Sequence, residues 1–287
     1  MTTKLISKPV IEKTLNALNA DCLALKEKGI VPNLHVFLVG DHLPSQIYTR
    51  NKKKFCEKIG ARCKIISLPG STTEQDLLSK LDKSNNDEDV DGIIIQLPLP
   101  KHLNHLSTSH LVVPEKDIDG FHPENIYKLM DPKSFEKTLI SCTPKGIISL
   151  LNFYDIPIKG QNIVIIGRSL IVGRPLSMLL TSLDASVTLC HSKTKNIKTI
   201  TRQADIIITA IGKESYLTKD FIGSNKPIIV DVGINRNQQG LLCGDVCYEE
   251  VYDLCKGITP VPGGVGPMTI LSLAQNLIQA SQERIRK

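Results

Sequence analysis

The chain has 287 residues, about twice the size of a common domain, and its 35 Lys and Arg against 29 Asp and Glu give a net charge of +6. Apolar residues make up 41 % and mean hydropathy is −0.03, which supports real hydrophobic cores and excludes a disordered chain. There are six Tyr, six Phe and no Trp, and the basic residues are spread along the chain, so nucleic-acid binding is disfavoured.

Targeting signals and cysteine motifs are missing from the sequence. No apolar run is long enough for a signal peptide in the opening MTTKLISKPVIEKTL or for a membrane span anywhere, so we expect no membrane association. The eight cysteines form no CxxC motif and have no histidine pair beside them, which disfavours a disulfide framework or a metal site. This cysteine usage fits the cytoplasm, a reducing compartment.

The first half of the chain alternates short apolar runs with amphipathic patterns, which is typical of parallel sheets covered by helices. The helical spacing of Val10, Leu18 and Leu25 indicates an N-terminal helix. The pattern then predicts a strand at 34–39, a helix at 45–59, a strand at 63–68, a helix near 74–83 and a strand at 92–96. Right-handed crossovers should make this βαβαβ unit a parallel sheet, and the stretch 97–142, rich in Pro, His and Asp, should be loops.

A second α/β unit is predicted to begin at Thr143 and Pro144, an N-cap residue followed by proline at the first helical position. The predicted elements are a helix at 144–154, a strand at 162–166, a helix at 172–183, strands at 186–190, 205–210 and 227–232, and a C-terminal helix at 268–284. The sequence therefore predicts a two-domain α/β protein with an N-terminal parallel-sheet βαβ domain and a Rossmann-like second domain.

A candidate dinucleotide site follows the strand at 162–166, where the chain reads GRSLIVG from Gly167 to Gly173. The spacing GxSxxxG is weak evidence alone, but a phosphate-binding turn takes this position between a strand and a helix. Gly167 allows the tight turn, the helix N-terminal amides near 171–174 can receive a pyrophosphate, and Ser169 can donate a hydrogen bond. An ordinary βα turn is the alternative interpretation.

The end of the next strand bears on the choice of cofactor. NAD-binding proteins usually place Asp or Glu there, which binds the ribose 2′-hydroxyl. Here the strand at 186–190 continues as HSKT, with Ser192 and Lys193 but no carboxylate, and Arg168 can approach the same region. A guanidinium, a hydroxyl and an ammonium fit a 2′-phosphate, which favours NADP; a solvated basic loop is the alternative.

The predicted helix at 45–59 carries candidate acid–base residues. Tyr48 and Lys52 are four residues apart and lie on one face, and a lysine beside a phenol in a partly desolvated site can exchange protons near neutral pH. The alternative interpretation is that Lys52, Lys53 and Lys54 form a solvated face of the helix. Because an α-helix turns by about 100° per residue, the three side chains cannot all point the same way, and one can face inward. A Tyr-x-x-x-Lys pair occurs in short-chain dehydrogenases too, but there it follows the nucleotide turn, whereas here it precedes Gly167.

Three longer strings are more specific. The first is DGIIIQLPLP at 91–100, in which the Gln96 side chain lies at the end of a predicted parallel strand. The second is KDIDGFHP at 116–123, which contains two carboxylates. The third is ITPVPGGVGPMT at 258–269. With these strings, and over nearly the whole chain from Val39 to Thr269, the sequence resembles the methylenetetrahydrofolate dehydrogenase/methenyltetrahydrofolate cyclohydrolase family, the FolD type.

The resemblance implies roles for the residues that match the family's motifs. Lys52 matches the catalytic lysine, with Tyr48 on the same helix and Gln96 as the amide that hydrogen-bonds the lysine. Asp119, the second Asp of the KDxDG string, matches the aspartate that grips the pterin ring. The implied substrate-binding residues are Tyr48, Lys52, Ile95, Gln96, Leu97, Asp119, Pro262, Gly263 and Gly264. The implied cofactor-binding residues are Gly167, Arg168, Ser169, Gly173, Ser192 and Ile234.

The resemblance also implies the organisation and activity of the chain. We expect a folate-binding catalytic domain at 1–144 with the C-terminal helix 268–287 packing back onto it, an NADP-binding domain at 145–267, a cleft between them, and a homodimer. The implied activities are NADP-dependent oxidation of 5,10-methylenetetrahydrofolate to 5,10-methenyltetrahydrofolate and hydrolysis of the product to 10-formyltetrahydrofolate. The expected partners are tetrahydrofolate derivatives, with no nucleic acid and no membrane.

Two other functions are weighed against this one. A monofunctional dehydrogenase would be best supported by loss of the lysine, but Lys52 is present. A non-catalytic folate- or nucleotide-binding regulator would require damage at Lys52, Gln96 or Asp119, and none is damaged. We interpret His122, beside Asp119, as a loop histidine rather than a site residue.

Overall fold

The computed structural model describes residues 1–285, which divide into two compact units. We call them the six-stranded unit and the three-stranded unit, after the main sheet of each. The six-stranded unit contains Met1–Glu12, Leu129–Ser134 and Thr143–Leu271. The three-stranded unit contains Lys13–Lys128, Phe135–Cys142 and the described chain from Ser272 onward.

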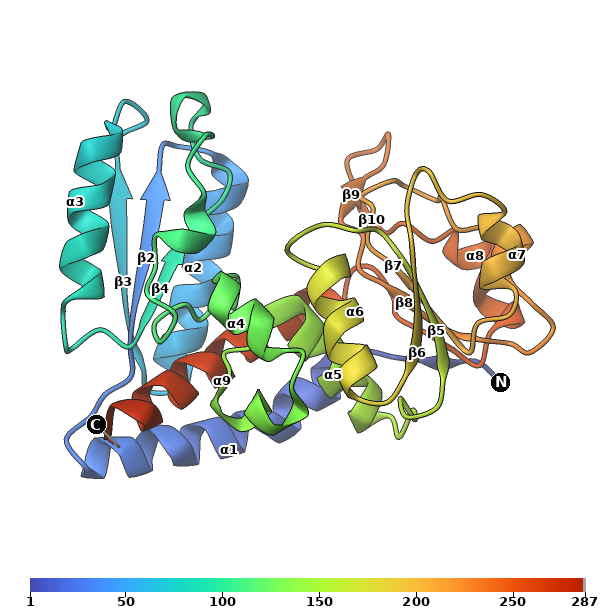
Figure 1. Ribbon diagram of the computed structural model, residues 1–287, viewed down its shortest axis with the longest axis horizontal. Coiled ribbons are helices and arrows are strands. Elements are labelled where there is room, and N and C mark those ends of the chain that lie inside the picture. Colours follow the sequence, from blue (N-terminus) through green and yellow to red (C-terminus); the bar gives the residue numbers. More distant parts are fainter. Residues whose placement is uncertain (286–287) are drawn as a thin grey trace. The chain divides into compact units, whose positions relative to one another are not determined.

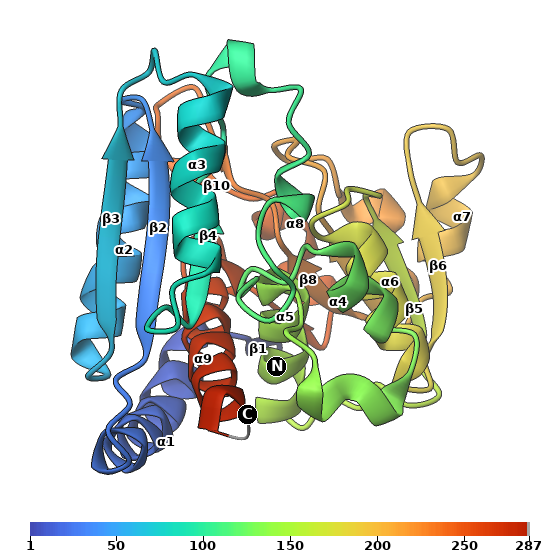
Figure 2. The ribbon, with the colours of Figure 1, turned by 60° about the vertical axis from the view of Figure 1, so that its left-hand side comes forward.

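The three-stranded unit is a parallel sheet with helices on both faces (Figures 1 and 2). Its elements are α1 (Ser7–Glu27, which begins in the other unit), β2 (Asn33–Val39), α2 (Leu43–Lys58), β3 (Arg62–Leu68), α3 (Glu74–Asn85), β4 (Gly92–Ile95), the 3-10 turns η1 (Lys101–Leu103) and η2 (Thr108–His110), and α4 (Pro123–Lys128). The strand order is β3-β2-β4, so the chain steps first to one side of β2 and then to the other. Right-handed crossovers therefore place α2 and α3 on opposite faces, and Figure 2 shows α3 in front of the sheet and α2 behind it.

The residues of β2 explain why this sheet needs two helical layers. Six of its seven residues are buried, His35 among them, so β2 has no solvent-facing side and must be covered on both faces. Phe37 and Val39 share one core cluster with Leu77 and Leu81 of α3. At the start of α3, Thr73 accepts a hydrogen bond from the Asp76 amide at 3.1 Å, which caps the helix.

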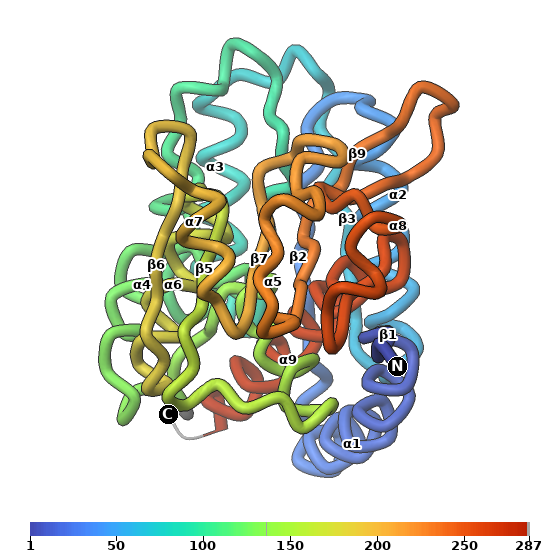
Figure 3. Tube along the Cα trace, turned by 90° about the vertical axis from the view of Figure 1, so that its right-hand side faces the viewer, coloured from blue at the N-terminus to red at the C-terminus, as the bar shows by residue number. Residues whose placement is uncertain are grey.

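The six-stranded unit is a Rossmann-like parallel sheet with strand order β6-β5-β7-β8-β11-β1. Its elements are β1 (Thr3–Lys4), the 3-10 turn η3 (Pro132–Lys137, which runs into the other unit), α5 (Cys142–Phe153), β5 (Asn162–Ile166), α6 (Gly173–Ser182), β6 (Ser186–Cys190), α7 (Ile197–Thr201), β7 (Ile206–Thr209), η4 (Lys219–Phe221), β8 (Ile228–Asp231), β9 (Asn235–Arg236), β10 (Leu242–Cys243), α8 (Tyr248–Val251), η5 (Tyr252–Leu254), β11 (Gly257–Ile258) and α9 (Val265–Ile285, which continues into the other unit). Figure 3 shows β6, β5 and β7 side by side in that order.

Successive side chains of β5 point to opposite faces of the sheet and contribute to two separate core clusters. Ile163 and Ile165 join a cluster with residues of α5 and α6 on one face, and Val164 and Ile166 join a second cluster with Phe221 on the other. The chain moves from β5 to β6 on one side and later returns to β7 on the other side of β5. Such a reversal of strand order opens a crevice at the carboxyl ends of the strands, where open α/β sheets bind ligands.

The structure confirms the two-domain α/β fold and corrects two details. The predicted N-cap, Thr143, lies inside α5, because the Cys142 amide donates to the Asp119 carbonyl oxygen at 3.3 Å and the helix begins there. The first residues belong with the six-stranded unit, since β1 pairs with β11, whereas the sequence grouped 1–144 together. Within residues 1–285, no helix is long and apolar enough to cross a membrane.

Candidate active site

The centre of the candidate site is a hydrogen bond between Lys52 and Gln96 in the three-stranded unit. Gln96 directly follows β4. Its backbone N–H donates to the Phe37 carbonyl oxygen at 2.9 Å, so the hydrogen bonds between β2 and β4 continue to this residue. Lys52 Nζ donates to Gln96 Oε1 at 3.2 Å. Gln96 Nε2 donates to the Leu97 carbonyl oxygen at 2.9 Å, so the amide is held with its oxygen toward the lysine.

Helix α2 presents Lys52 to this position. Lys52 is half-buried, whereas Lys53 and Lys54 are exposed, as expected for consecutive residues about 100° apart. Tyr48, one turn earlier, is 42 % exposed. Of these three consecutive lysines, only Lys52 points toward Gln96 at the end of β4, and the other two face solvent.

Sequence analysis missed Ser45, which is buried at the start of α2. Its hydroxyl donates to the Leu97 carbonyl oxygen at 3.2 Å and contacts His42 Nδ1 at 2.8 Å. The Leu97 carbonyl therefore receives hydrogen bonds from both Ser45 and Gln96. The available signal was spacing: Ser45 lies about two turns before Lys52, on the same helical face.

Asp119 lies in the electrostatic field of Lys52. It is mostly buried, and this burial raises the pKa of its carboxyl group, while the Lys52 charge acts in the opposite direction. The structure thus brings three predicted site residues, Lys52, Gln96 and Asp119, into one region of one unit. Their roles in binding and catalysis stay predictions.

Buried polar contacts fix the loop that carries Asp119. The Asp117 carboxylate accepts hydrogen bonds from the His122 amide at 2.7 Å and from Asn125 Nδ2 at 3.1 Å. Asn276 of α9 is fully buried, and its Nδ2 donates to the carbonyl oxygens of Ile118 and Ile140, both at 2.8 Å. Sequence analysis missed Asn276, because its partners are backbone groups far away in the sequence.

One tight backbone position and one side-chain hydrogen bond complete this loop. Gly120 has φ +73°, and a Cβ there would lie 2.6 Å from the Ile140 carbonyl carbon, so only glycine fits. The His122 ring accepts a hydrogen bond from the Glu124 amide at 3.2 Å, in the first turn of α4. His122 therefore has a local structural contact.

The six-stranded unit contains the candidate dinucleotide turn. Gly167 has φ +125°, and a Cβ on it would lie 2.9 Å from the Ala210 carbonyl carbon, just after β7. A Cβ on Gly173 would overlap the Gly167 carbonyl oxygen, so the absence of a side chain lets α6 begin directly against the turn. Ser169 Oγ accepts hydrogen bonds from the Val172 amide at 3.1 Å and the Gly173 amide at 3.4 Å. This compact turn at a helix N-terminus suits a pyrophosphate.

The predicted 2′-phosphate residues follow adjacent strand ends. The register pairs Ile166 of β5 with Cys190 of β6, so Arg168 and Ser192 each lie two residues past a paired position at the same sheet edge. The loop after β6 is shaped by a hydrogen bond from the His191 amide to Thr194 Oγ1 at 2.9 Å. The loop HSKT contains no carboxylate to repel a phosphate.

Sequence analysis also missed two buried aspartates in this unit. Asp231, the last residue of β8, accepts hydrogen bonds from the amides of Gly233, Asp245 and Val246, each at 2.9 Å, and burial raises its pKa to about 6. Asp245 accepts hydrogen bonds from the amides of Ile211 and Lys213, both at 2.7 Å. Together they hold the loops after β7 and β8.

The other predicted binding residues are dispersed. Ile95 packs in the core of the three-stranded unit, whereas the Leu97 side chain is 43 % exposed. Ile234, after β8, is 55 % exposed. The loop with Pro262, Gly263 and Gly264 belongs to the six-stranded unit, and the Gly263 carbonyl oxygen accepts a hydrogen bond from the hydroxyl of Ser7 at 2.8 Å. Their ligand contacts stay predictions.

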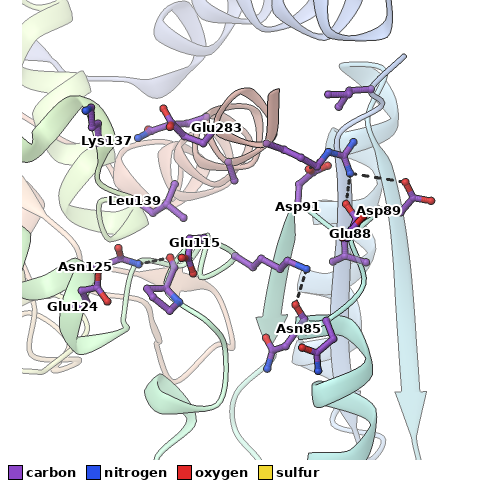
Figure 4. A pocket seen from close by; sticks show the side chains of 18 of the residues that line it. Asn85, Glu88, Asp89, Asp91, Glu115, Glu124, Asn125, Lys137, Leu139 and Glu283 are labelled. Carbon is purple, nitrogen blue, oxygen red and sulfur yellow. Dashed lines mark hydrogen bonds and ion pairs between the residues drawn. The ribbon is translucent and has the colours of Figure 1, made fainter. Parts of the chain in front are cut away.

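A hollow of about 870 Å³ lies at the start of β4, at the opposite end of this strand from Gln96 (Figure 4). Arg284 of α9 lies there with Nε 3.3 Å from Asp91 Oδ1, and its Nη1 donates to the Glu88 carbonyl oxygen at 2.6 Å. Lys116 Nζ donates to the Asn85 carbonyl oxygen at 2.8 Å, which caps the end of α3. Both cations are therefore held by groups of the hollow's own wall, and neither Lys52, Gln96 nor Asp119 lines this hollow. Within residues 1–285, no cluster of His, Cys, Asp and Glu could hold a metal ion.

Two family models match the chain and together cover most of it. The model described as "Tetrahydrofolate dehydrogenase/cyclohydrolase, catalytic domain" matches residues 5–119, and the model described as "Tetrahydrofolate dehydrogenase/cyclohydrolase, NAD(P)-binding domain" matches residues 141–285. The bifunctional protein FolD of Bacillus cytotoxicus is 44 % identical over 273 residues, which are 95 % of this chain and 94 % of that protein.

Solved structures agree over the whole length. The bifunctional enzyme FolD, a methylenetetrahydrofolate dehydrogenase/cyclohydrolase from Campylobacter jejuni, has a TM-score of 0.93 and 41 % identity and covers 99 % of this chain and 100 % of its own. The Trypanosoma brucei enzyme, solved with NADP and an inhibitor, has a TM-score of 0.91 and 30 % identity and covers 100 % of this chain and 99 % of its own.

Proposed function

Because the chain belongs to the tetrahydrofolate dehydrogenase/cyclohydrolase family, we propose that it carries out both reactions in this name. It oxidises 5,10-methylenetetrahydrofolate to 5,10-methenyltetrahydrofolate with NADP and hydrolyses the product to 10-formyltetrahydrofolate. The observation that carries the proposal is the Lys52–Gln96 hydrogen bond of 3.2 Å in the region that also contains the mostly buried Asp119.

The hydrolysis step requires proton transfers. Water adds to the methenyl carbon, which requires removal of a water proton, and ring opening then requires a proton at the departing nitrogen. We assign both transfers to Lys52, because Gln96 holds its Nζ in one direction and Tyr48 lies one turn away on the same face of α2. Gln96 is in turn fixed through the Leu97 carbonyl oxygen, so the lysine is oriented before substrate binds.

We assign Asp119 to the pterin ring. A carboxylate can accept paired hydrogen bonds from the exocyclic amino group and the neighbouring ring N–H. Its mostly buried position strengthens such contacts, and the nearby Lys52 charge favours the ionised form that accepts them. Asn276 and Asp117 hold the loop, so the ring is bound at a fixed distance from Lys52.

We assign nucleotide binding to the turn at 167–173. The overlap that a Cβ on Gly173 would cause shows that backbone approaches backbone closely here, as a pyrophosphate cradle requires. Arg168 and Ser192 would bind the 2′-phosphate at the shared edge of β5 and β6. NADP, when bound, supplies the hydride acceptor, and the protein's contribution is to hold the reacting carbons together. No strong base is needed, because N5 and N10 stabilise the resulting cation.

The catalytic assignment is tested with Lys52→Met and a matched control, Lys54→Met, which removes an exposed lysine from the same helix. We expect Lys52→Met to abolish methenyltetrahydrofolate hydrolysis, followed by absorbance, while nucleotide binding and the melting temperature stay unchanged. Lys54→Met should hydrolyse at the wild-type rate. Normal hydrolysis by Lys52→Met would refute the assignment.

The cofactor assignment is tested by comparing kcat/KM for NADP and NAD in the oxidation of methylenetetrahydrofolate. We expect NADP to be preferred, because no carboxylate follows β6 and Arg168 lies at the same edge. An equal or higher kcat/KM with NAD would contradict the assignment. Transient accumulation of methenyltetrahydrofolate in the same assay separates the two activities and distinguishes a bifunctional enzyme from a monofunctional dehydrogenase.

We further propose that the protein is a cytoplasmic homodimer. The segment with β10 is apolar and outward-facing: Leu241 is 62 % exposed and Leu242 is 43 % exposed, which suits an interface. Light scattering after gel filtration should give twice the chain mass of 31.6 kDa, and a monomer mass would refute this part.

A further inference from the structure

His42, the residue just before α2, makes a side-chain contact that the proposed chemistry does not use. It lies at the N-cap position and is exposed, but its side chain forms no capping hydrogen bond to the helix. Its ring nitrogen Nδ1 lies 2.8 Å from the hydroxyl oxygen of Ser45 instead. Ser45 is 3 % exposed and donates to the Leu97 carbonyl oxygen at 3.2 Å. One buried hydroxyl group therefore connects an exposed ring to the candidate active site.

The direction of these two hydrogen bonds follows from the number of hydrogen atoms. A serine hydroxyl group has one hydrogen to donate, and a carbonyl oxygen can only accept. Because the Ser45 hydrogen is donated to Leu97, His42 Nδ1 must carry its own hydrogen and donate it to Ser45 Oγ. A ring with its hydrogen on Nε2 alone would accept at Nδ1 and compete with Leu97 for the hydroxyl hydrogen.

The Leu97 carbonyl oxygen connects this contact to the candidate acid–base residue. It accepts hydrogen bonds from Ser45 at 3.2 Å and from Gln96 Nε2 at 2.9 Å. Gln96 Oε1 in turn accepts from Lys52 Nζ at 3.2 Å. Ser45 and Lys52 both belong to α2, whereas the other two residues follow β4, so these contacts form a closed circuit between the helix and the strand end. Loss of the Ser45 hydrogen bond would open the circuit and let Lys52 move relative to Gln96.

We propose that His42 is a positioning residue for the hydrolysis step, because its Nδ1–H directs the Ser45 hydroxyl group to the Leu97 carbonyl oxygen. This inference rests on the proposed function, in which Lys52 transfers the protons of hydrolysis. Reversal of the hydrogen bond should lower the kcat of hydrolysis. The KM should stay unchanged, because the pterin ring is assigned to Asp119. The dehydrogenase reaction needs no strong base and should also stay unchanged.

Two variants of nearly equal shape separate the positioning role from helix capping. Asn and Asp are both favoured at an N-cap, so His42→Asn and His42→Asp should each melt at or above the wild-type temperature. The Asn amide can donate to Ser45 Oγ as the ring does, whereas the Asp carboxylate can only accept and should take the hydroxyl hydrogen from Leu97. We expect His42→Asn to retain the kcat of hydrolysis within about twofold and His42→Asp to be about fivefold slower.

Two further variants test how the effect reaches the lysine. Gln46→Glu adds a negative charge six residues from Lys52 rather than ten, and Gln46 forms its hydrogen bonds with Asp41 and Arg50 rather than with Ser45. It should hydrolyse at the wild-type rate. The double variant His42→Asp/Ser45→Ala should be as slow as Ser45→Ala alone, because the residue at 42 acts only through the hydroxyl group.

The direction of the hydrogen bond also has a readout that is independent of activity. In full-length protein labelled with ¹⁵N-histidine, NMR correlation of ring nitrogens and carbon-bound hydrogens at alkaline pH shows which nitrogen carries the hydrogen. The chain has seven histidines, and the signals of His42 are those missing from His42→Asn. We expect the hydrogen on Nδ1, and a ring with its hydrogen only on Nε2 would overturn the proposal.

A slower hydrolysis in His42→Asp, with an unchanged dehydrogenase rate and recovery in His42→Asn, would support the positioning role. Equal kcat values in these two variants, an equal loss in Gln46→Glu, or additive losses in the double variant would overturn it. If the wild-type protein does not hydrolyse methenyltetrahydrofolate at all, the proposed function fails, while the NMR measurement still decides the direction of the hydrogen bond.

Discussion

Replacing Gly173 by alanine adds one carbon atom, Cβ, to the candidate dinucleotide turn. The new Cβ would overlap the Gly167 carbonyl oxygen and lie 2.7 Å from the Gly167 carbonyl carbon, whereas carbon atoms in contact prefer about 3.5–4.0 Å. A displacement of roughly 1 Å is therefore required. The turn should move rather than α6, because Leu176 and Leu180 of α6 are buried in the core, whereas Arg168 and Leu170 are exposed.

The cost of this displacement sets the expected effect. Inserting a methyl group into a close-packed position costs about 1–3 kcal/mol, which corresponds to ~5-fold to ~150-fold weaker binding if NADP needs the original turn. We expect the KM for NADP in the dehydrogenase reaction to rise within this range. Hydrolysis of methenyltetrahydrofolate needs no nucleotide and should be unchanged.

The matched control is Gly70→Ala, because a Cβ on Gly70 would meet nothing nearer than 3.7 Å. This variant should keep wild-type constants in both reactions. The reasoning would be refuted by a KM for NADP within twofold of wild type in Gly173→Ala. An equal loss of both activities with a lower melting temperature would show that the damage is to folding rather than to the turn.

Three further predictions concern the three-stranded unit. Burial raises the pKa of the Asp117 carboxyl group from 3.8 to about 6, so Asp117 ionises at lower pH in the unfolded chain than in the folded protein. Between pH 4 and pH 7, the free energy of unfolding of the wild type should therefore fall by roughly 2–3 kcal/mol relative to that of Asp117→Asn, measured by urea denaturation. A difference that stays constant over this pH range would contradict the prediction. Asn276→Leu removes the donor that the carbonyl oxygens of Ile118 and Ile140 share and leaves Ile118 only the hydrogen bond from the Cys142 thiol, which should lower the free energy of unfolding by roughly 1–3 kcal/mol; a loss below about 0.5 kcal/mol would refute it. Ser45→Ala removes one donor to the Leu97 carbonyl oxygen and should slow hydrolysis about fivefold, and an unchanged kcat would show that Gln96 alone suffices.

Continuous apolar runs made most of the fold predictable. β5 and β6 have the predicted bounds. β5 is buried and apolar on both faces, whereas β6, at the end of the sheet, alternates exposed with covered residues, and both strands end where polar turn residues begin. The two-residue strands β1 and β11 were not predictable, since a pair of residues has no period. Their pairing depends on residues more than 250 positions apart.

Some residues of the candidate site could be predicted from the sequence, and others could not. The inward direction of Lys52 follows from helix geometry, and the Lys52–Gln96 contact was expected from the family motifs. Ser45, Asn276 and the Asp231–Asp245 pair act on backbone groups, which carry no sequence signal of their own. Such partners become visible only when tertiary structure brings the loops together.

The pairing of β1 with β11 imposes an order on synthesis of the chain. Thr3 and Lys4 are synthesised more than 250 residues before their partners, Gly257 and Ile258. β1, the outermost strand of the six-stranded sheet, must therefore stay unpaired until β11 has been made. Long-range pairing of this kind slows folding and prolongs exposure of a sheet edge.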